Sequence, residues 1–311
     1  MGHPAPPGQA PALASPPRWP RPGQPLGLVA PGGAFAPEAY QAGLAALQEL
    51  APGLTVRAGQ ELASRDGYFA GGDQERAGHL QRLLTDPGLG LVMAVRGGFG
   101  CSRLLPLMDL TACAQAGGCL LGFSDLTCLL NALASQGLVA LHGPVLTQLP
   151  RLDGPSRADL AGLLAGRRPW PLSLAGAAVR TGRAVGPLLG GNLTLLCHLL
   201  GTPWFPPLTG AILLLEDTGE AAYRLDRLLT QLELAGVFGQ VAGVAVGWLS
   251  QEAPWPEGLA ATVERRLAGL GVPVVGGLPF GHGGANRLLP LGALAELDGQ
   301  AGTLTVGLGL A

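Results

Sequence analysis

The sequence predicts an α/β protein in which a mostly parallel sheet flanked by helices is joined to a smaller α/β C-terminal domain with short β segments. Three observations support this fold class. Short apolar strands alternate with helix-like segments from residue 26 onward. Apolar residues make up 48% of the 311 residues, which is enough for a sizeable core. Glycine (51) and proline (28) are abundant, which indicates many tight turns and glycine-lined loops.

The elements of the N-terminal domain, residues 26–150, follow from apolar runs and their breakers. Short apolar runs that end in Gly or Pro are typical of buried strands, and we expect them at 26–30, 89–95, 119–122 and 139–141. Longer segments with helical spacing predict helices at 37–50, 73–85 and from 126 to about 133. Asp86-Pro87 ends the second of these helices.

The second half of the chain begins with residues 151–184, which are irregular and rich in Arg, Gly and Pro, and which we interpret as a linker. A C-terminal domain at 185–311 follows. Its periodicity predicts helices near 192–200, 221–235 and 257–267, and strands at 211–215, 241–247 and 272–275. The tail at 288–308 alternates turns with short β segments.

Residues 1–25 are proline-rich and contain no apolar run, so they predict a flexible leader and not a signal peptide. No segment reads as a membrane span, because the uncharged stretch 126–150 is interrupted by polar residues. We therefore expect a cytoplasmic protein. We also expect that removal of residues 1–24 leaves activity intact.

Composition excludes several function classes. All 19 basic residues are Arg, so Schiff-base enzymes and nucleotide hydrolases with a P-loop lysine are excluded. The net charge is −2 and no basic tract occurs, which argues against nucleic-acid binding. The five cysteines include no CxxC pair, and no HExxH motif is present, so we expect no metal site, no cofactor and no disulfide framework.

Two glycine-rich turns follow predicted strands in the N-terminal domain. In Gly122-Phe123-Ser124-Asp125, a sharp strand-to-helix turn exposes its serine at the carboxyl edge of the sheet, beside free N–H groups. Ser124 is then either a nucleophile or, like Asp125, a plain helix cap, and the tetrapeptide alone favours the cap. The loop at 96–100 (RGGFG) either presents N–H groups to a ligand or forms an ordinary turn.

The C-terminal domain adds carboxylates and a histidine. Glu216 and Asp217 end the strand at 211–215. A carboxylate there orients a histidine or begins a helix, and the second role accounts for Glu220 and suits Asp217. His282 lies between glycines on a loop, where an imidazole suits general-base chemistry. His142, in His-Gly-Pro after a strand, is a further candidate to line the same cleft.

Ser124, Glu216 and His282 together have the residue types of a serine-hydrolase triad, which is defined by roles and not by chain order. Each lies after a strand or in a glycine-rich loop, where α/β sheets place their ligands. Whether the three side chains meet in space is left open by the sequence.

The motifs resemble the LD-carboxypeptidases, or muramoyltetrapeptide carboxypeptidases, a family of serine peptidases that also includes the microcin C immunity peptidases. The matching stretches run in order across residues 26–298, and only the leader falls outside. They are VAPGG (29–33), GYFAGGDQERAGHLQRLLTDP (67–87), VRGGFG (95–100), LLGFSDLT (120–127), HGP (142–144), LLGGNLTLLCHLLGTP (188–203), LLLEDTGEAAYRLDRLLTQLELAG (213–236) and GLPFGHGGANRLLPLG (277–292).

The resemblance implies a two-domain fold with the nucleophile in the first domain and the base and its carboxylate in the second. Carried over by motif, Ser124 is the nucleophile, His282 the general base and Glu216 the residue that orients it. The reaction implied is cleavage of the amide between the L-centre of a diamino acid and a terminal D-alanine in a murein tetrapeptide, through an acyl-enzyme, in cell-wall recycling. A homodimer is implied as well.

The resemblance also suggests further site residues. The oxyanion hole is implied to be the backbone N–H of Asp125 with one from the glycine loop, Gly98 in preference to Gly97. Asn192 is a site-shaping candidate. Arg96 either meets a substrate carboxylate or braces its loop. The identity of the diamino acid stays open.

Two other functions remain to be weighed. The microcin-immunity branch hydrolyses peptidyl or aminoacyl adenylate analogues and tends to have a longer loop before the glutamate. The short segment 193–214 favours the carboxypeptidase branch, although Trp204 keeps the alternative open. A non-catalytic protein that binds cell-wall peptides is the other alternative, and the presence of all three triad candidates argues against it.

Overall fold

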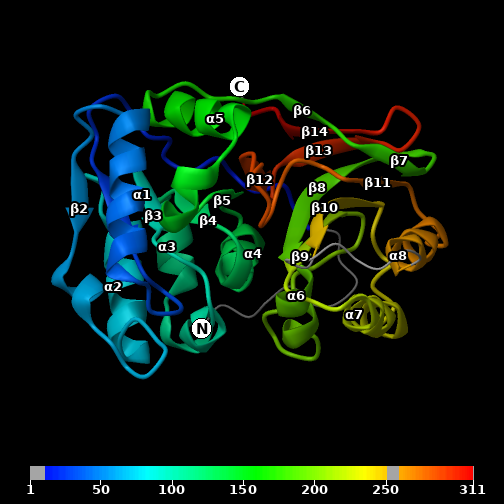
Figure 1. The fold of residues 1–311 in the computed structure, drawn as a ribbon, viewed down its shortest axis with the longest axis horizontal. Coiled ribbons are helices and arrows are strands. Elements are labelled where there is room, and N and C mark those ends of the chain that lie inside the picture. Colours follow the sequence, from blue (N-terminus) through cyan, green and yellow to red (C-terminus); the bar gives the residue numbers. More distant parts are fainter. Residues whose placement is uncertain (1–10, 251–258, 311) are drawn as a thin grey trace.

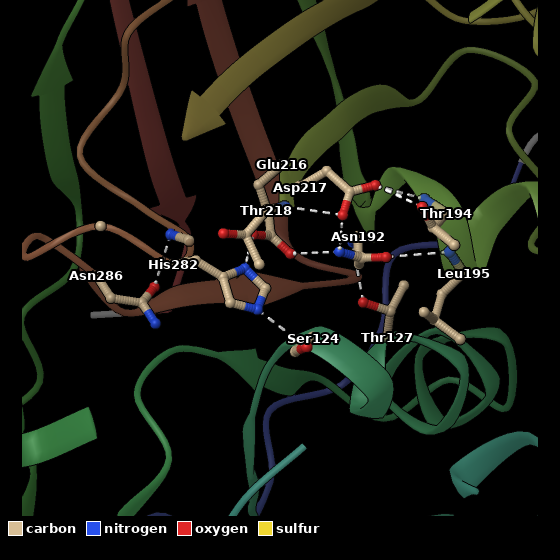
Figure 2. A network of polar contacts seen from close by, with 12 residues as sticks. Ser124, Thr127, Asn192, Thr194, Leu195, Glu216, Asp217, Thr218, His282 and Asn286 are labelled. Carbon is tan, nitrogen blue, oxygen red and sulfur yellow. Dashed lines mark hydrogen bonds and ion pairs between the residues drawn. The ribbon is translucent and has the colours of Figure 1, made fainter. Parts of the chain in front are cut away.

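The computed structural model describes residues 11–250 and 259–310. Two β-sheets, each with its own helices, lie side by side (Figure 1). The chain forms the first sheet almost completely before it enters the second, and the α/β class with two domains is therefore confirmed. Ser124 and His282, on opposite sides of this division, face each other where the two units meet (Figure 2).

The N-terminal sheet has the strand order β12-β5-β4-β3-β1-β2. Strands β1 to β5 are parallel, as expected for short strands that alternate with helices. Every residue of β1, β3, β4 and β5 is buried, which explains why these strands read as continuous apolar runs. The strands are β1 (Leu26–Val29), β2 (Val56–Ala58), β3 (Leu91–Ala94), β4 (Leu120–Gly122) and β5 (Ala140–His142).

Two helices of this unit have the boundaries that the sequence predicts. Helix α1 (Pro37–Leu50) begins with proline at its first position, where the ring removes no needed hydrogen bond. Helix α2 (Asp73–Thr85) has acidic residues in its first turn, and Asp86 is its C-cap residue. Helices α3 (Leu110–Ala116) and α4 (Thr127–Ser135) follow. Helix α1 packs on the 3-10 helix Leu146–Arg151, whereas α2, α3 and α4 pack on one another in order.

The C-terminal sheet has the order β6-β14-β13-β8-β9-β10-β11-β7. Strands β8 to β11 are parallel to one another, and antiparallel strands extend the sheet on both sides. This sheet has more strands than the N-terminal one, so the C-terminal unit is larger than the sequence suggests. Its strands are β6 (Leu172–Ala175), β7 (Ala177–Arg180), β8 (Arg183–Asn192), β9 (Ile212–Thr218), β10 (Gly243–Ser250), β11 (Val274–Gly276), β13 (Leu294–Asp298) and β14 (Thr303–Leu308).

Helices α6 (Leu193–Leu199), α7 (Ala222–Leu234) and α8 (Leu259–Ala268) belong to this unit, and α6 packs on α7 and α7 on α8. Figure 1 shows α6 next to the middle strands of the C-terminal sheet and α8 next to its β7 edge, with α7 between them. The helix expected at 257–267 is present, but its first expected residues lie outside the described part of the chain.

The expected linker at 151–184 is mostly regular structure. Helix α5 (Gly154–Leu164) is capped by Asp153, whose side chain accepts a hydrogen bond from the Ser156 amide. Strands β6 and β7 then form the two outer edges of the C-terminal sheet. These strands were not predicted because they are short edge strands made mostly of small, exposed residues: only Leu174 among their residues is buried.

One strand crosses the domain boundary. β12 (Leu289–Leu291) comes from the C-terminal part of the sequence but pairs antiparallel with β5 of the N-terminal sheet. The boundary at residue 185 therefore does not separate two independent units, because the last strand of the first sheet follows the catalytic-histidine candidate in sequence.

Residues 11–25 differ from the flexible leader that the sequence predicts. The Ala14 amide donates to the carbonyl oxygen of Gly292, and the Ser15 amide donates to that of Gly137. The Trp19 ring lies 4.8 Å from the ring of buried Trp170. Proline stiffens this segment, and main-chain hydrogen bonds with an aromatic contact hold it on both units.

Candidate active site

Ser124 occupies the turn between β4 and α4 with a φ of 63°, a left-handed conformation that no other non-glycine residue adopts in the described part of the chain. Such a conformation costs of order 1–3 kcal/mol and persists only where its surroundings enforce it. Its Oγ lies 3.1 Å from Nε2 of His282. The helix-cap interpretation fails, because no side chain caps the 3-10 turn or α4.

The glycine loop after β3 approaches the serine closely. A methyl group at Gly97 would lie 3.0 Å from Cβ and 3.2 Å from Oγ of Ser124, and 3.3 Å from the Asp125 amide nitrogen. The Gly97 carbonyl oxygen accepts a hydrogen bond of 2.9 Å from the Gly33 amide. Gly98 has a φ of 97° and packs on Gly33. The backbone of Gly97 therefore lies beside the nucleophile candidate because a side chain is absent there, whereas Gly98 packs on Gly33.

Two buried charged side chains, Arg76 and Asp125, hydrogen-bond to the main chain at the end of this loop. The guanidinium of Arg76 donates to the carbonyl oxygens of Pro31, Gly71 and Gly100, which lie on three different loops. Asp125 is buried, and one of its carboxylate oxygens accepts a hydrogen bond of 2.9 Å from the Cys101 amide. Burial raises the pKa of Asp125, because a carboxylate loses its hydration there.

His282 and Glu216 complete the contact. Nδ1 of His282 lies 2.6 Å from Oε2 of Glu216, which is fully buried near the end of β9 (Figure 2). The loop has glycine where it passes the carboxylate, since a methyl group at Gly281 would lie 2.8 Å from Glu216 Oε2. A serine hydroxyl, an imidazole and a carboxylate thus form one hydrogen-bonded line, the arrangement of a serine-hydrolase triad.

A polar network holds the carboxylate. Nδ2 of Asn192 lies 3.3 Å from Oε1 of Glu216 and 2.9 Å from Oδ1 of Asp217. The other oxygen of Asp217 accepts from the amide and the hydroxyl of Thr194 at 2.9 and 2.7 Å. The side chain of Asn192 also caps α6. The main-chain N–H of Asn192 donates to the Thr127 hydroxyl of the N-terminal unit (Figure 2). Each carboxylate oxygen of Glu216 and Asp217 therefore has a polar partner.

The structure corrects one prediction about charged residues and clarifies two others. Asp217 lies within β9 and not at a helix start, whereas Glu220 precedes α7 and pairs with Arg224. Arg96 is exposed, and its guanidinium donates to the Ala34 carbonyl oxygen at 2.7 Å, which favours the bracing role over the carboxylate-binding one.

His142 does not line the cleft. It is fully buried at the end of β5, and its ring lies 5.8 Å from that of Phe123, which in turn lies 4.7 Å from the His282 ring. Burial, aided by the nearby His282, lowers the pKa of His142 to about 3. His142 is therefore neutral near pH 7.

Several other features of the described chain lie outside the triad. One hollow of about 410 Å³ is lined by residues of β2 and α2, and one of about 550 Å³ is lined in part by residues 17–24. Neither is lined by a triad residue.

The five cysteines are free and buried. None of the helices in the described part of the chain is long and apolar enough to cross a membrane.

Sequence reasoning missed two buried amides beside the base. Gln148 and Asn286 hydrogen-bond to each other and to the loop that holds His282. Neither has a side chain that performs acid–base or nucleophilic chemistry. The available signal was a polar residue inside the apolar run at 145–149.

Comparisons with known proteins identify the family of the chain. Residues 26–143 match the model of the LD-carboxypeptidase N-terminal domain, and residues 185–297 match that of the C-terminal domain. A putative carboxypeptidase of Synechocystis sp. is 44% identical over 81% of this chain and 84% of its own length. The murein tetrapeptide carboxypeptidase of Pseudomonas aeruginosa is 36% identical over 88% of this chain and 93% of its own.

Solved structures extend the likeness to the fold. The muramoyltetrapeptide carboxypeptidase from Oxalobacter formigenes has a TM-score of 0.79 and 30% identity, and the match covers 91% of this chain and 98% of that one. Both domain models match in order, and the sequence relatives span most of both chains. The chain therefore belongs to the LD-carboxypeptidase family.

Proposed function

We propose that this peptidase is a serine LD-carboxypeptidase that releases terminal D-alanine from a murein tetrapeptide. The observation that carries the proposal is the line from Ser124 Oγ through His282 to the buried carboxylate of Glu216. Two relatives whose names specify murein or muramoyl tetrapeptide as substrate, at 36% and 30% identity, support the substrate class.

The proposed mechanism follows from the hydrogen bonds. The Nδ1–H of His282 donates a hydrogen bond to the Glu216 carboxylate, and Nε2 accepts the Ser124 proton as the hydroxyl attacks the amide carbonyl, which leaves an imidazolium. The protonated imidazole gives its proton to the leaving D-alanine amine, and an acyl-enzyme remains. Water, deprotonated by His282, then hydrolyses the ester and regenerates the hydroxyl.

Backbone amides are proposed to stabilise the tetrahedral oxyanion. The candidates are the N–H of Asp125 and one from the glycine loop, Gly98 or Gly97, since this loop packs against Ser124. Removing one such donor typically costs about 10²–10³ in kcat. Asn192 is proposed to shape the site through Glu216, because its amide contacts that carboxylate. A homodimer and a cytoplasmic location stay predictions.

The test is D-alanine release from a purified tetrapeptide, with Ser124→Ala run beside the wild type. We expect release by the wild type and a loss of at least about 10⁴-fold in the variant. Equal release by both would contradict the serine assignment. If the wild type is labelled at Ser124 by a fluorophosphonate but releases no D-alanine, the substrate proposal fails, and aminoacyl adenylate analogues become the next substrates to assay. A binding protein without catalysis would not be labelled.

A further inference from the structure

The loop that holds His282 has little stiffness of its own. It runs from Gly281 to Asn286 with glycine on both sides of the histidine. Glycine allows many backbone conformations, so such a loop does not fix an imidazole by itself. The Nε2–Oγ distance of 3.1 Å to Ser124 therefore requires support from elsewhere.

Gln148 of the N-terminal unit provides that support on the main chain. Its Nε2 donates to the carbonyl oxygens of Gly281 and Gly283, at 3.0 and 3.2 Å, directly before and after His282. Its Oε1 accepts a hydrogen bond of 2.8 Å from Nδ2 of Asn286. The Gln148 side chain thus binds the main chain of the loop on both sides of His282.

Asn286 connects Gln148 to the loop and to Ser156 through hydrogen bonds. Its Oδ1 accepts from the Gly281 amide at 3.1 Å, and its own amide donates to the Ser156 hydroxyl at 2.9 Å. Gln148 is 1% exposed, and Asn286 and Ser156 are fully buried. A buried amide with two carbonyl partners on its nitrogen and a donor on its oxygen has one orientation that satisfies all of them.

These contacts join two parts of the chain that are distant in sequence. Gln148 lies on the 3-10 helix Leu146–Arg151 and Ser156 on α5, whereas His282 follows β11 of the C-terminal unit. Two further contacts tie the same segments together, the Asp153 amide to the Gly284 carbonyl oxygen and Arg287 to Asp159. The nucleophile's own unit therefore holds the loop that presents the base.

We propose that Gln148 is a positioning residue that aligns His282 with Ser124 across the boundary between the two units. Its side-chain hydrogen bonds go to Gly281, Gly283 and Asn286, so it acts on His282 through the main chain of the loop. The inference rests on the proposed function, in which His282 is the general base. The same hydrogen bonds then join the two units and align the His282 imidazole with Ser124.

The decisive variant is Gln148→Met, which keeps length and removes the amide. The loop loses both donor contacts, so His282 relaxes away from Ser124. We expect the rate of Ser124 labelling by a fluorophosphonate probe to fall about 10- to 100-fold, since displacement of about 1 Å has effects of this size. For D-alanine release, kcat should fall to the same extent while KM changes less than about twofold, because substrate contacts are untouched.

Gln136→Met is the matched control. It makes the same chemical change at a half-buried amide whose side-chain contact is the Thr111 hydroxyl, remote from the loop. It should label and turn over at wild-type rates. A milder variant, Ser156→Ala, removes only the acceptor for the Asn286 amide and should slow labelling about 3- to 10-fold while KM is kept.

Each outcome decides the inference. Folded Gln148→Met that labels at the wild-type rate, or that raises KM while kcat is unchanged, overturns it. If Gln148→Met does not fold, wild-type labelling of Ser156→Ala overturns it. The probe separates this inference from the substrate proposal: a labelled wild type that releases no D-alanine refutes only the substrate, and labelling still decides the role of Gln148. A wild type that is not labelled refutes the serine mechanism and this inference together.

Discussion

On the N-terminal side of the site the main chain places the reacting group, whereas on the C-terminal side buried side chains do so. Ser124 is held by its own left-handed φ and by glycine backbone that approaches it. His282 and Glu216 are held by amides, carboxylates and hydroxyls that satisfy one another. The first arrangement depends on the absence of side chains, and the second depends on their presence and orientation.

This difference predicts how each side responds to mutation. A polar network loses function when one partner is exchanged for a close isostere, because hydrogen-bond direction is lost although shape is kept. A turn that depends on glycine instead loses its geometry when a side chain is added to the glycine, because neighbouring atoms must move. The variants below separate these two responses.

The largest effect is expected from Glu216→Gln. Glutamine keeps the shape but cannot stabilise the imidazolium or hold the same tautomer, so kcat should fall about 10⁴-fold, as for the corresponding exchange in serine proteases. D-alanine release and probe labelling measure it. Glu296→Gln on β13, half-buried in the C-terminal sheet, is the control and should behave as the wild type. Comparable activity of Glu216→Gln and the wild type would show that the carboxylate charge is not needed.

The next effect concerns acid stability. The pKa of His142 is about 3 in the folded chain, against an ordinary 6.5, so between these values only the unfolded chain takes up the proton. Stability therefore falls as the pH falls through this window, by about 2–3 kcal/mol between pH 7 and pH 4.5 from this group alone. His142→Leu should lack this loss in urea unfolding at the two pH values. An equal loss in both proteins would show that the buried ring is charged in the fold.

Gly97→Ala tests the glycine-built side. The added methyl group meets Ser124 Cβ and Oγ at 3.0 and 3.2 Å, so the loop or the serine must move. We expect kcat to fall about 100-fold with little change in stability, because oxyanion donors are displaced. Gly271→Ala is the matched control, since a methyl group there would meet nothing within 4 Å and its φ is ordinary. Wild-type turnover in Gly97→Ala would refute the need for close backbone approach.

The smallest effect is expected at residues 11–25, which contact both units but none of the triad. Trp19→Ala removes the ring contact with Trp170 and should lower the free energy of unfolding by about 1–2 kcal/mol, while kcat stays at the wild-type value. Leu13→Ala, at a side chain that is 54% exposed, should change neither. Unchanged stability of Trp19→Ala would show that the segment does not fasten the two units.

The same difference explains what the sequence could predict. Ser124, His282 and Glu216 stand in turns and at a strand end, where chemistry-bearing residues are conspicuous, and the structure places them within hydrogen-bond distance. The helices at 37–50 and 73–85 could also be predicted from the sequence. A proline marks the start of the first, and acidic residues and Asp86-Pro87 mark the start and the end of the second.

The residues that escaped prediction act through tertiary contacts. Gln148 sits in an apolar run, and only the approach of residues 281–286 gives it partners. Asp217 resembled a helix-start acid because its neighbours in sequence do not reveal Thr194 or Asn192 as donors. Edge strands β6 and β7 are short and contain a single buried residue, Leu174, which is too little to mark a strand in the sequence.

The pairing of β12 with β5 bears on the order of events during synthesis. Until residues 289–291 leave the ribosome, β5 is an open edge with unpaired donors and acceptors. The chain just before that strand delivers the histidine, so a nascent polypeptide displays its serine long before the base arrives. Under the proposed mechanism such a polypeptide cannot hydrolyse anything. The histidine and the strand that closes the first sheet are therefore synthesised one directly after the other, near the end of the chain.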